Sequence, residues 1–235
     1  MQYLREAKVV RVEKKSLGGV TNARKVVIEN DGIRAHTIFR AVHEIYRNAR
    51  WDNGLFTPYL RDSYQNELAA HELSRLLGFD HVPPTIPWKL GRTKGALQLW
   101  IEKAEPGYRE DEQRRPADPE AFLKERDTMR VFDALIENID RNAGNMLIDS
   151  NGRVWWIDHT RSFGQSRDLH GGESIGRCAR RFYERLKSTD PAVIRERLSP
   201  FLGRYEIEAL LVRRLKLIAL IEQRITDYGE ENVLF

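Results

Sequence analysis

The 235-residue sequence predicts an α+β protein, with an antiparallel sheet and one helix in its first part and mainly helices in its second. Short β-type runs separated by turns fill most of the first hundred residues. Helical periodicity takes over from residue 120, and the charge-rich, proline-containing stretch 104–119 separates the two regions. We therefore expect an N-terminal lobe at residues 1–103 and a mostly helical C-terminal lobe at residues 104–235.

Five strands account for the sheet of the first lobe. Asn30-Asp31-Gly32 indicates a tight turn between the second and third, because Asn, Asp and Gly accept the left-handed backbone that hairpin turns need. Leucines near helical spacing predict one helix at residues 64–78, with Gly78 as its C-terminal stop. The expected strands are residues 8–13, 24–29, 33–42, 85–90 and 96–102.

The second lobe is expected to begin with a helix at residues 120–138, followed by a β-hairpin. The chain after Gly176 has a helical pattern with a break at Ser199-Pro200. Residues 176–187 are rich in arginine and could hold an acidic substrate, but a solvated helix face is the commoner role of such charges.

Composition and charge indicate the cellular setting. Cys178 is the one cysteine, so the sequence predicts neither an internal disulfide nor a zinc cluster, as expected in the reducing cytoplasm. Charges near the N-terminus argue against a secretory segment, and basic residues interrupt the apolar run at 210–221, so no membrane span is predicted. Lys and Arg exceed Asp and Glu by 39 to 35, which suits a nucleotide ligand, but the signs are too interleaved to predict nucleic-acid binding.

The chemistry is expected around the hairpin of the second lobe. Asn151-Gly152 is the preferred pair for a two-residue type I′ turn, whose register sets Asn145 directly opposite Asp158. Directly opposed side chains lie about 5 Å apart, so an amide oxygen and a carboxylate would converge on one cation such as Mg²⁺. Asp140, five residues before Asn145, would stand close by as the base for an attacking hydroxyl.

Two alternatives stay open for these residues. Taken singly, Asp140, Asn145 and Asp158 would more often be helix caps and turn residues. Arg141 would either balance the local negative charge or bind a phosphate as a planar fork. The predicted register sets Asn145 opposite Asp158, and apolar residues flank both in the two strands. Together these observations favour a metal site.

At this point the sequence resembles the protein-kinase-like superfamily, in which a catalytic Asp, an Asn five residues later and a metal-binding Asp recur at the spacing of Asp140, Asn145 and Asp158. The phrase Leu-Ile-Glu-Asn-Ile-Asp-Arg at 135–141 is similar to the atypical branches, namely phosphoinositide lipid kinases, HipA-type kinases and the Golgi casein kinase family. The resemblance implies a two-lobed kinase-like fold that uses ATP with Mg²⁺ or Mn²⁺. The chain departs from those branches at Asn142, where they have His.

A second resemblance covers residues 66–73 and 76–85, which are similar to a helix and the helix exit of the Golgi casein kinase family. It implies that Glu67 orients the cation that binds the ATP phosphates, whereas a solvated charge is the commoner role of a helical Glu. The cation is either Arg40, which stands in the position of the family's Lys, or Lys25 on the preceding strand.

Nucleotide-binding backbone is implied at two further places. A glycine-containing segment between the first two strands stands where a kinase has its phosphate-covering loop, although such glycines are also ordinary turn residues. The end of the last strand stands where a kinase hinge binds adenine, although a strand end with a packed Trp fits equally well. The loop residues are Gly18, Gly19, Val20 and Thr21, and the hinge residues are Trp100, Ile101 and Glu102.

The function that the resemblance implies is transfer of the γ-phosphate of ATP to a hydroxyl of a protein Ser or Thr, a sugar or a small molecule. Three departures, at Arg40, Asn142 and Thr160, where a Gly is usual, keep open a nucleotide-binding pseudokinase scaffold. A kinase-fold enzyme with another ATP-dependent chemistry, such as AMP transfer, is the third alternative. The sequence does not specify the acceptor.

Overall fold

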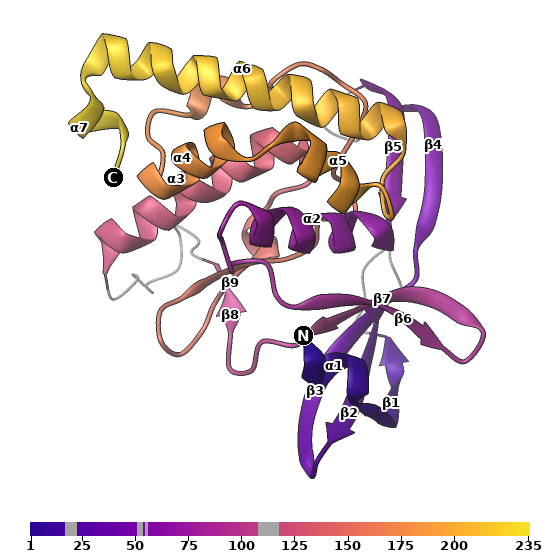
Figure 1. The fold of residues 1–235 in the computed structure, drawn as a ribbon. Coiled ribbons are helices and arrows are strands. Elements are labelled where there is room, and N and C mark those ends of the chain that lie inside the picture. Colours follow the sequence, from indigo (N-terminus) through magenta and orange to yellow (C-terminus); the bar gives the residue numbers. More distant parts are fainter. Residues whose placement is uncertain (17–22, 51–53, 55, 108–117) are drawn as a thin grey trace.

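The structure is a computed structural model that describes residues 1–16, 23–50, 54, 56–107 and 118–235. It is an α+β fold with two lobes, as the sequence predicts, one built on a five-stranded antiparallel sheet and the other mainly on helices. Figure 1 shows the sheet at the bottom of the view and layers of helices above it.

The N-terminal lobe contains the five predicted strands. They are β1 (Lys8–Ser16), β2 (Arg24–Asn30), β3 (Ile33–Arg40), β6 (Thr85–Leu90) and β7 (Thr93–Leu99). Their order is β1-β2-β3-β7-β6, and all neighbours are antiparallel. Asp31 and Gly32 have φ of +50° and +75°, which confirms the tight turn between β2 and β3. An unpredicted short helix, α1 (Gln2–Glu6), packs Leu4 into the buried cluster of this sheet.

A second hairpin follows β3 and was not predicted. It pairs β4 (His43–Arg50) with β5 (Phe56–Ser63) and stands beside the helical lobe rather than in the main sheet (Figure 1). The described side chains of β4 are exposed, including Ile45 and Tyr46. No alternating buried stripe therefore marks β4 in the sequence. The Tyr59 hydroxyl donates to Glu206 at 3.0 Å, which ties β5 to the helical lobe.

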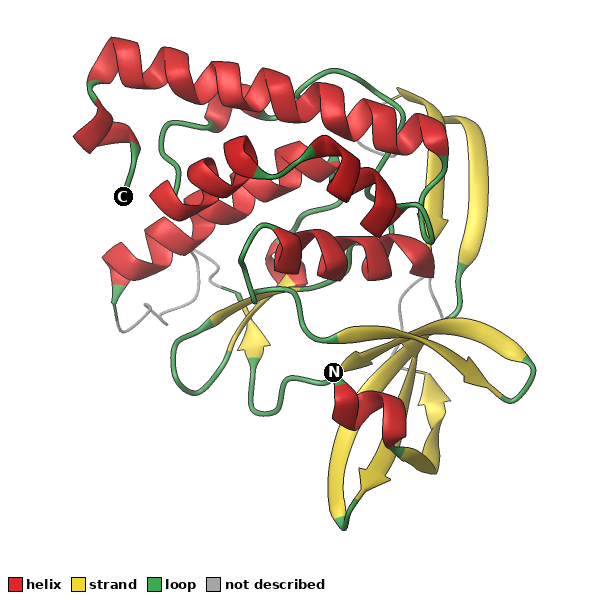
Figure 2. Ribbon diagram, viewed as in Figure 1, coloured by secondary structure: helices red, strands yellow, loops and turns green. Residues whose placement is uncertain are grey.

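Helix α2 (Tyr64–Leu76) lies between the sheet and the other helices (Figure 2). Ser63 caps its start, because the Ser63 Oγ accepts the Gln65 N–H at 3.1 Å, and Gly78, with φ of +81°, follows its end as predicted. The sequence places this helix with the sheet, yet its buried residues Ala69, Ala70 and Leu73 belong to the core cluster of the helical lobe. The helix is therefore held by both lobes.

The C-terminal lobe is mainly helical, and its helix break after residue 198 is confirmed. A second break before Pro191 was not predicted; Asp190 caps the new helix by accepting the Ala192 N–H at 2.7 Å. The two-residue strand β8 (Glu105–Pro106), which pairs with β9, was also not predicted. The remaining elements are α3 (Pro119–Ile136), η1 (Ala143–Asn145), β9 (Met146–Ile148), β10 (Val154–Trp156), η2 (Gly172–Ser174), α4 (Arg180–Ser188), α5 (Pro191–Leu198), α6 (Arg204–Tyr228) and α7 (Glu230–Val233).

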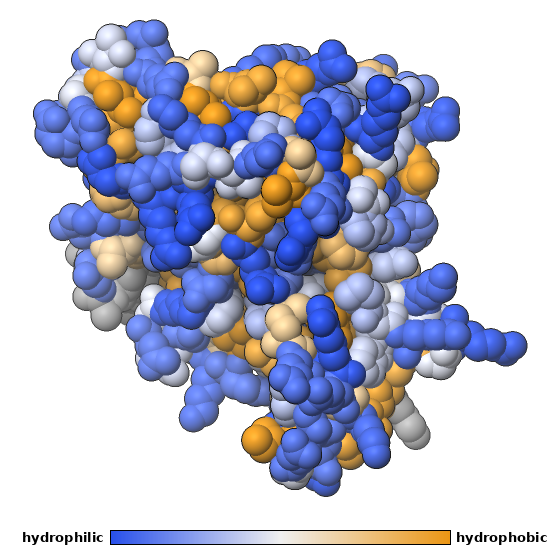
Figure 3. Space-filling view, viewed as in Figure 1, coloured by the Kyte–Doolittle hydropathy of each residue, from blue (hydrophilic) through white to orange (hydrophobic). Residues whose placement is uncertain are grey.

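The surface is mostly hydrophilic on the face drawn in Figure 3, with apolar patches over α6. Leu215 and Tyr205 are exposed side chains of that helix, at 61% and 71%. Among the described residues, no helix has both the length and the apolar composition needed to cross a bilayer.

Candidate active site

The hairpin of β9 and β10 is present, but its register is one residue away from the predicted one. Val154 pairs with Ile148, whereas a two-residue turn would pair it with Asp149. The prediction that Asn145 directly faces Asp158 was therefore wrong. Instead, the residue before Asp158 donates its N–H to the Asn145 carbonyl at 3.0 Å.

Asp149 gives the physical reason for this shift. Its Oδ1 accepts the backbone N–H groups of Asn151 at 2.9 Å and Arg153 at 3.1 Å. A three-residue loop results, in which Gly152 has a φ of +78°, the arrangement of a type I turn followed by a left-handed residue. The Asn-Gly pair therefore marks a turn, as predicted, but of a different type.

Asp140, Asn145 and Asp158 come together through the connections around the hairpin rather than across it. Asn145 Nδ2 donates to the Asp140 carbonyl at 2.9 Å, so its Oδ1 remains the acceptor of that amide. Asp158 follows β10 with a φ of +60°, a backbone conformation that is uncommon for a residue with a side chain. Such strain persists only where the surrounding structure holds it, and it is concentrated at functional sites.

The charges around Asp158 fit a cation. Burial raises the pKa of Asp158 above its ordinary value, and the negative charges of Glu67 and Asp140 raise it further against the opposing effect of Arg40. A divalent cation would relieve this repulsion. Within the described part of the chain, no three His, Cys, Asp or Glu side chains form a metal cluster. The amide oxygen of Asn145 and the carboxylate of Asp158 are the kind of oxygen donors that Mg²⁺ takes.

Glu67 and Arg40 form a buried ion pair between α2 and β3. Glu67 Oε1 lies 3.7 Å from Arg40 Nε, and their side chains are 1% and 7% exposed. Glu67 also accepts the backbone N–H of His159 at 3.1 Å and faces its Nδ1 at 3.4 Å. Burial alone would raise the pKa of Glu67, but Arg40 and His159 together lower it to about 2. Glu67 is therefore not a solvated helix charge.

Lys25, the other cation considered, lies elsewhere. Its Nζ stands 4.5 Å from the centroid of the Trp100 ring, a cation–π contact. The expected hinge is tied to β3, since the Trp100 N–H donates to the His36 carbonyl at 3.0 Å and Glu102 Oε1 lies 2.5 Å from His36 Nδ1. Ile101 is half-buried beside them. The predicted loop lies outside the described residues: Gly18, Gly19, Val20 and Thr21.

Arg141 balances local negative charge rather than presenting a free fork to a phosphate. Its guanidinium donates to both oxygens of Asp133, at 2.8 and 3.0 Å, and to the carbonyls of Asn145 at 2.5 Å and Ile157 at 2.8 Å. Its Nη2 also lies 3.1 Å from His159 Nε2. Arginine is a donor only, so Nε2 accepts and Nδ1 carries the proton toward Glu67.

A clamp on the segment after Asp158 was missed by sequence reasoning. Asn66, fully buried beside Glu67, donates through Nδ2 to the carbonyls of Thr160 at 2.6 Å and Ser162 at 2.9 Å. The Ser63 N–H donates to the Thr160 carbonyl at 3.0 Å. These bonds hold the segment in place where kinases usually have a glycine. The position of Asn66 in the phrase at 66–73 was the one available signal.

Arg161 is a second residue that sequence reasoning missed. Its Nε donates to Asp62 Oδ2 at 2.9 Å and its Nη1 to Asp140 Oδ2 at 3.4 Å. Asp62 is 1% exposed and belongs to β5. The unpredicted hairpin therefore reaches the Asp140 carboxylate through one arginine.

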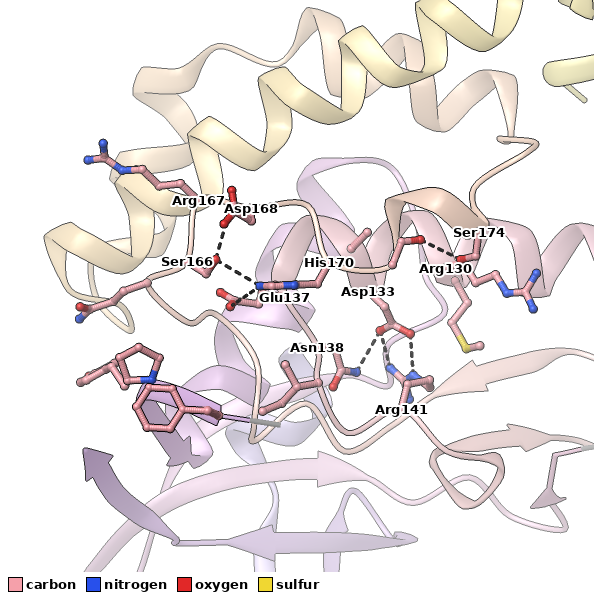
Figure 4. A pocket seen from close by; sticks show the side chains of 18 of the residues that line it. Arg130, Asp133, Glu137, Asn138, Arg141, Ser166, Arg167, Asp168, His170 and Ser174 are labelled. Carbon is pink, nitrogen blue, oxygen red and sulfur yellow. Dashed lines mark hydrogen bonds and ion pairs between the residues drawn. The ribbon is translucent and has the colours of Figure 1, made fainter. Parts of the chain in front are cut away.

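A pocket of about 1010 Å³ opens beside the Asp140 segment. One wall is a face of α3, another is the loop at residues 165–171, and a third is the start of β5. Figure 4 shows Glu137 and His170 in the middle of this pocket, with Arg130 and Arg167 toward opposite ends.

Comparison with solved structures identifies the fold. The structure of hydra Fam20 with sugar matches with a TM-score of 0.67 at 20% identity, covering 100% of this chain and 90% of that one. The Golgi casein kinase with Mn and ADP bound matches with a TM-score of 0.64 at 16% identity, covering 97% and 76%. The Helicobacter pylori proinflammatory kinase CtkA matches with a TM-score of 0.57 at 13% identity, covering 92% and 96%. The chain therefore has an atypical protein-kinase-like fold.

Comparison by sequence finds a match over only part of the chain. No family model matches the chain. Protein Rv2133c of Mycobacterium tuberculosis is 28% identical over 151 residues, which cover 51% of this chain and 54% of that protein. The chain thus spans about half the length of the curated relative it matches.

Proposed function

We propose that this chain is an ATP- and metal-dependent phosphotransferase of the atypical kinase type. Asn145 and Asp158 hold Mg²⁺ or Mn²⁺, which neutralises charge on the phosphates when bound. Arg40, oriented by Glu67, binds the phosphates, and Asp140 orients the acceptor hydroxyl and accepts its proton. The Golgi casein kinase, which shares the fold, has been solved with Mn and ADP.

One observation carries this proposal, namely the shared network of Glu67 and its partners. Glu67 contacts Arg40 on one side and His159 on the other, and His159 directly follows Asp158. The cation that would bind phosphate and the carboxylate that would bind metal are thus fixed relative to each other by one buried side chain. Such preorganisation lowers the cost of aligning charge during phosphoryl transfer.

The remaining nucleotide contacts are also proposed from the kinase-like fold. The backbone of residues 18–21 would cover the phosphates, and residues 100–102 would bind adenine where the lobes join near residue 103. Lys25, stacked on Trp100, would lie at the adenine end and leave the phosphates to Arg40. Cross-linking with an adenine-reactive ATP analogue would label Lys25 or Trp100 on this assignment, and labelling confined to the helical lobe would contradict it.

Transfer of radiolabel from γ-labelled ATP tests the reaction. We expect Asp140→Asn and Asp158→Asn to reduce turnover with Mn²⁺ by about 10²-fold or more, because each removes a charge used in the transition state. Asp80→Asn, an exposed carboxylate at 82%, is the matched control and should retain wild-type turnover. Turnover retained in both site variants would contradict the proposal.

The same preparation separates the alternatives. A pseudokinase would be stabilised thermally by Mn-ATP, in the wild type but not in Asp158→Asn, without any turnover. An AMP transferase would release pyrophosphate and add the mass of AMP to its product. A phosphotransferase releases ADP and adds the mass of one phosphoryl group.

A further inference from the structure

The pocket shown in Figure 4 adjoins the segment that carries Asp140. Its lining includes Asn138, Ile139 and Arg141, the residues on both sides of Asp140. Its volume of about 1010 Å³ lies at the upper end of the range for small-molecule sites. A molecule held there contacts the residues that flank Asp140, which is not itself among the lining residues.

The acidic side chains of the pocket are already matched by cations. Asp133 binds Arg141 at 2.8 Å, Glu137 binds Arg213 at 3.0 Å, and Asp168 binds Lys216 at 3.0 Å. Asp133 and Glu137 therefore offer little negative charge to a ligand. The ion pair of Asp168 is exposed, at 79% and 45%, and stands at the Arg167 end of the pocket (Figure 4).

Three arginines of the lining, Arg126, Arg130 and Arg167, are not matched in this way among the described residues; Arg126 and Arg130 lie together on α3, whereas Arg167 lies alone toward the opposite end (Figure 4). Arg126 Nε is buried and has no hydrogen-bond partner among the described residues. Arg130 lies 3.7 Å from Asp127, which also binds Arg177 at 3.1 Å, so one carboxylate serves two guanidinium groups. Ion pairs between partly exposed side chains contribute little free energy, so Asp127 neutralises Arg130 only weakly. The lining therefore has a surplus of positive charge around Arg126 and Arg130.

Helix α3 fixes the distance between the two arginines, Arg126 and Arg130, and the Asp140 segment that follows the helix. Arg126 and Arg130 are four residues apart on α3 and share the helix face that also carries Asp133 and Glu137 to the pocket. At 1.5 Å per residue, Arg130 lies roughly 10 Å along the helix from its end at Ile136. Between the two ends the lining is partly apolar, with Met129, Ala134 and Ile139.

We propose that this pocket binds the acceptor, and that the acceptor is a small anionic alcohol whose phosphate or carboxylate lies against Arg126 and Arg130 while its hydroxyl lies near Asp140. The proposal rests on the proposed phosphotransferase function. In the reaction, the bond between the γ-phosphorus and the β,γ-bridging oxygen breaks and a bond from phosphorus to the acceptor oxygen forms. The hydroxyl proton passes to Asp140, and ADP leaves.

A series of ω-hydroxyalkyl phosphates of increasing chain length tests the proposal, with the matched uncharged α,ω-diols and ω-hydroxy carboxylates beside it. Acceptor-dependent ADP release is measured with Mn-ATP. We expect the anionic compounds to have a KM at least about tenfold lower than the diols, because a charge-assisted hydrogen bond to arginine is lost in the diol. We expect one chain length to be preferred, because the two arginines and the Asp140 segment have fixed places around the same pocket.

Variants locate the effect in the pocket. Arg130→Gln and Arg126→Gln should each raise the KM of the anionic compounds about tenfold and leave the KM of the diols unchanged, and Arg130→Lys should recover part of the loss. Arg34 lies in the other lobe with its side chain 67% exposed, and Arg34→Gln should change neither the KM of the anionic compounds nor the KM of the diols. Equal use of diols and anionic compounds, or no effect of either Gln variant, would overturn the proposal.

Binding without nucleotide separates this proposal from the proposed function. Calorimetry with the preferred ω-hydroxyalkyl phosphate should give a Kd that Arg130→Gln weakens about tenfold, whether or not the protein transfers phosphate. No binding to the wild type, or equal binding to Arg130→Gln, would overturn the acceptor assignment. Binding to the pocket without turnover, combined with no stabilisation by Mn-ATP, would count against the phosphotransferase alone.

Discussion

Two buried glutamate–arginine pairs lie in different parts of the molecule, and their charges behave differently. Glu67 lies 3.7 Å from Arg40 between α2 and β3, and Glu137, which lines the pocket, lies 3.0 Å from Arg213. The pKa of Glu67 is lowered to about 2, whereas burial raises the pKa of Glu137 to about 7 despite Arg213. The closer arginine thus belongs to the less acidic carboxyl.

The difference comes from what else each member of the pair contacts. Glu67 accepts two further donors from His159, which stabilise its charged form. The Arg213 guanidinium also donates to the carbonyls of Leu135 at 2.9 Å, Gly164 at 3.3 Å and Ser166. The negative charge of Asp168 raises the pKa of Glu137 further. Glu67 therefore keeps its charge, and Arg213 of the other pair anchors the loop that lines the pocket.

Arg213→Met should have the largest effect on stability, about 3 to 5 kcal/mol, because it leaves a buried carboxyl and three carbonyls without their donor. The neighbouring Arg214 is the matched control. It is also buried and donates to three carbonyls, of Leu186, Lys187 and Thr189, but forms no ion pair with any described carboxylate. Urea unfolding of both Met variants measures the difference, and an equal loss would mean that the Glu137 pair contributes nothing beyond the carbonyl bonds.

Of changes to the two glutamates, Glu67→Gln should have the larger effect on activity. We expect a fall in kcat/KM for Mn-ATP of about 10²-fold, equivalent to about 3 kcal/mol, because Arg40 loses the charge that orients it. Glu72→Gln is the control on the same helix; Glu72 pairs with Arg197 of α5 instead. Glu137→Gln should leave the KM for Mn-ATP unchanged, and an equal rise in that KM in both variants would erase the contrast between the two pairs.

The pH dependence of stability should show opposite signs for the two glutamates. Glu137 has a folded pKa of about 7 against 4.5 in the unfolded chain, so between these values only the unfolded state is ionised, and stability falls as pH rises. The total loss is about 3 kcal/mol, complete above about pH 7. Glu67, at about 2, contributes stability that is gained between about pH 2 and 4.5 and is constant above.

Urea unfolding across this range checks the signs. From about pH 5 to pH 8 the stability of the wild type should fall relative to Glu137→Gln, while the difference between wild type and Glu67→Gln stays constant. A wild type whose stability runs parallel to that of Glu137→Gln would show that Glu137 titrates at its ordinary pKa in the fold.

Local patterns in the sequence were enough to predict much of the fold. Each of the five sheet strands has its own apolar run, and Asp31-Gly32 suits the turn in which both residues have positive φ. The β4–β5 hairpin could not be found this way, since its exposed strand β4 has no buried stripe. Its contacts with the helical lobe, such as Tyr59 with Glu206, join residues 147 positions apart in sequence.

The site was predicted through a geometric argument that proved wrong in register. Asn151-Gly152 favours a two-residue turn, but the Asp149 carboxylate stabilises a three-residue loop instead. A side chain competing for backbone donors is local chemistry that the turn pair alone does not reveal. Arg161 could not have been found at all, because Asp62 and Asp140 meet it only in the folded chain.

Arg161 gives the smallest effect and the sharpest test of how the β4–β5 hairpin contributes. Its guanidinium bridges the buried Asp62 and the Asp140 carboxylate, so we propose that it positions Asp140. Arg161→Met should lower kcat about tenfold without changing the Kd of Mn-ATP, and Arg161→Lys should recover part of the rate. Asp62→Asn should act through the same contact, so the double variant should be no slower than Arg161→Met alone. Additive losses would show that Asp62 and Arg161 act separately, and the hairpin would then have no link to the Asp140 carboxylate.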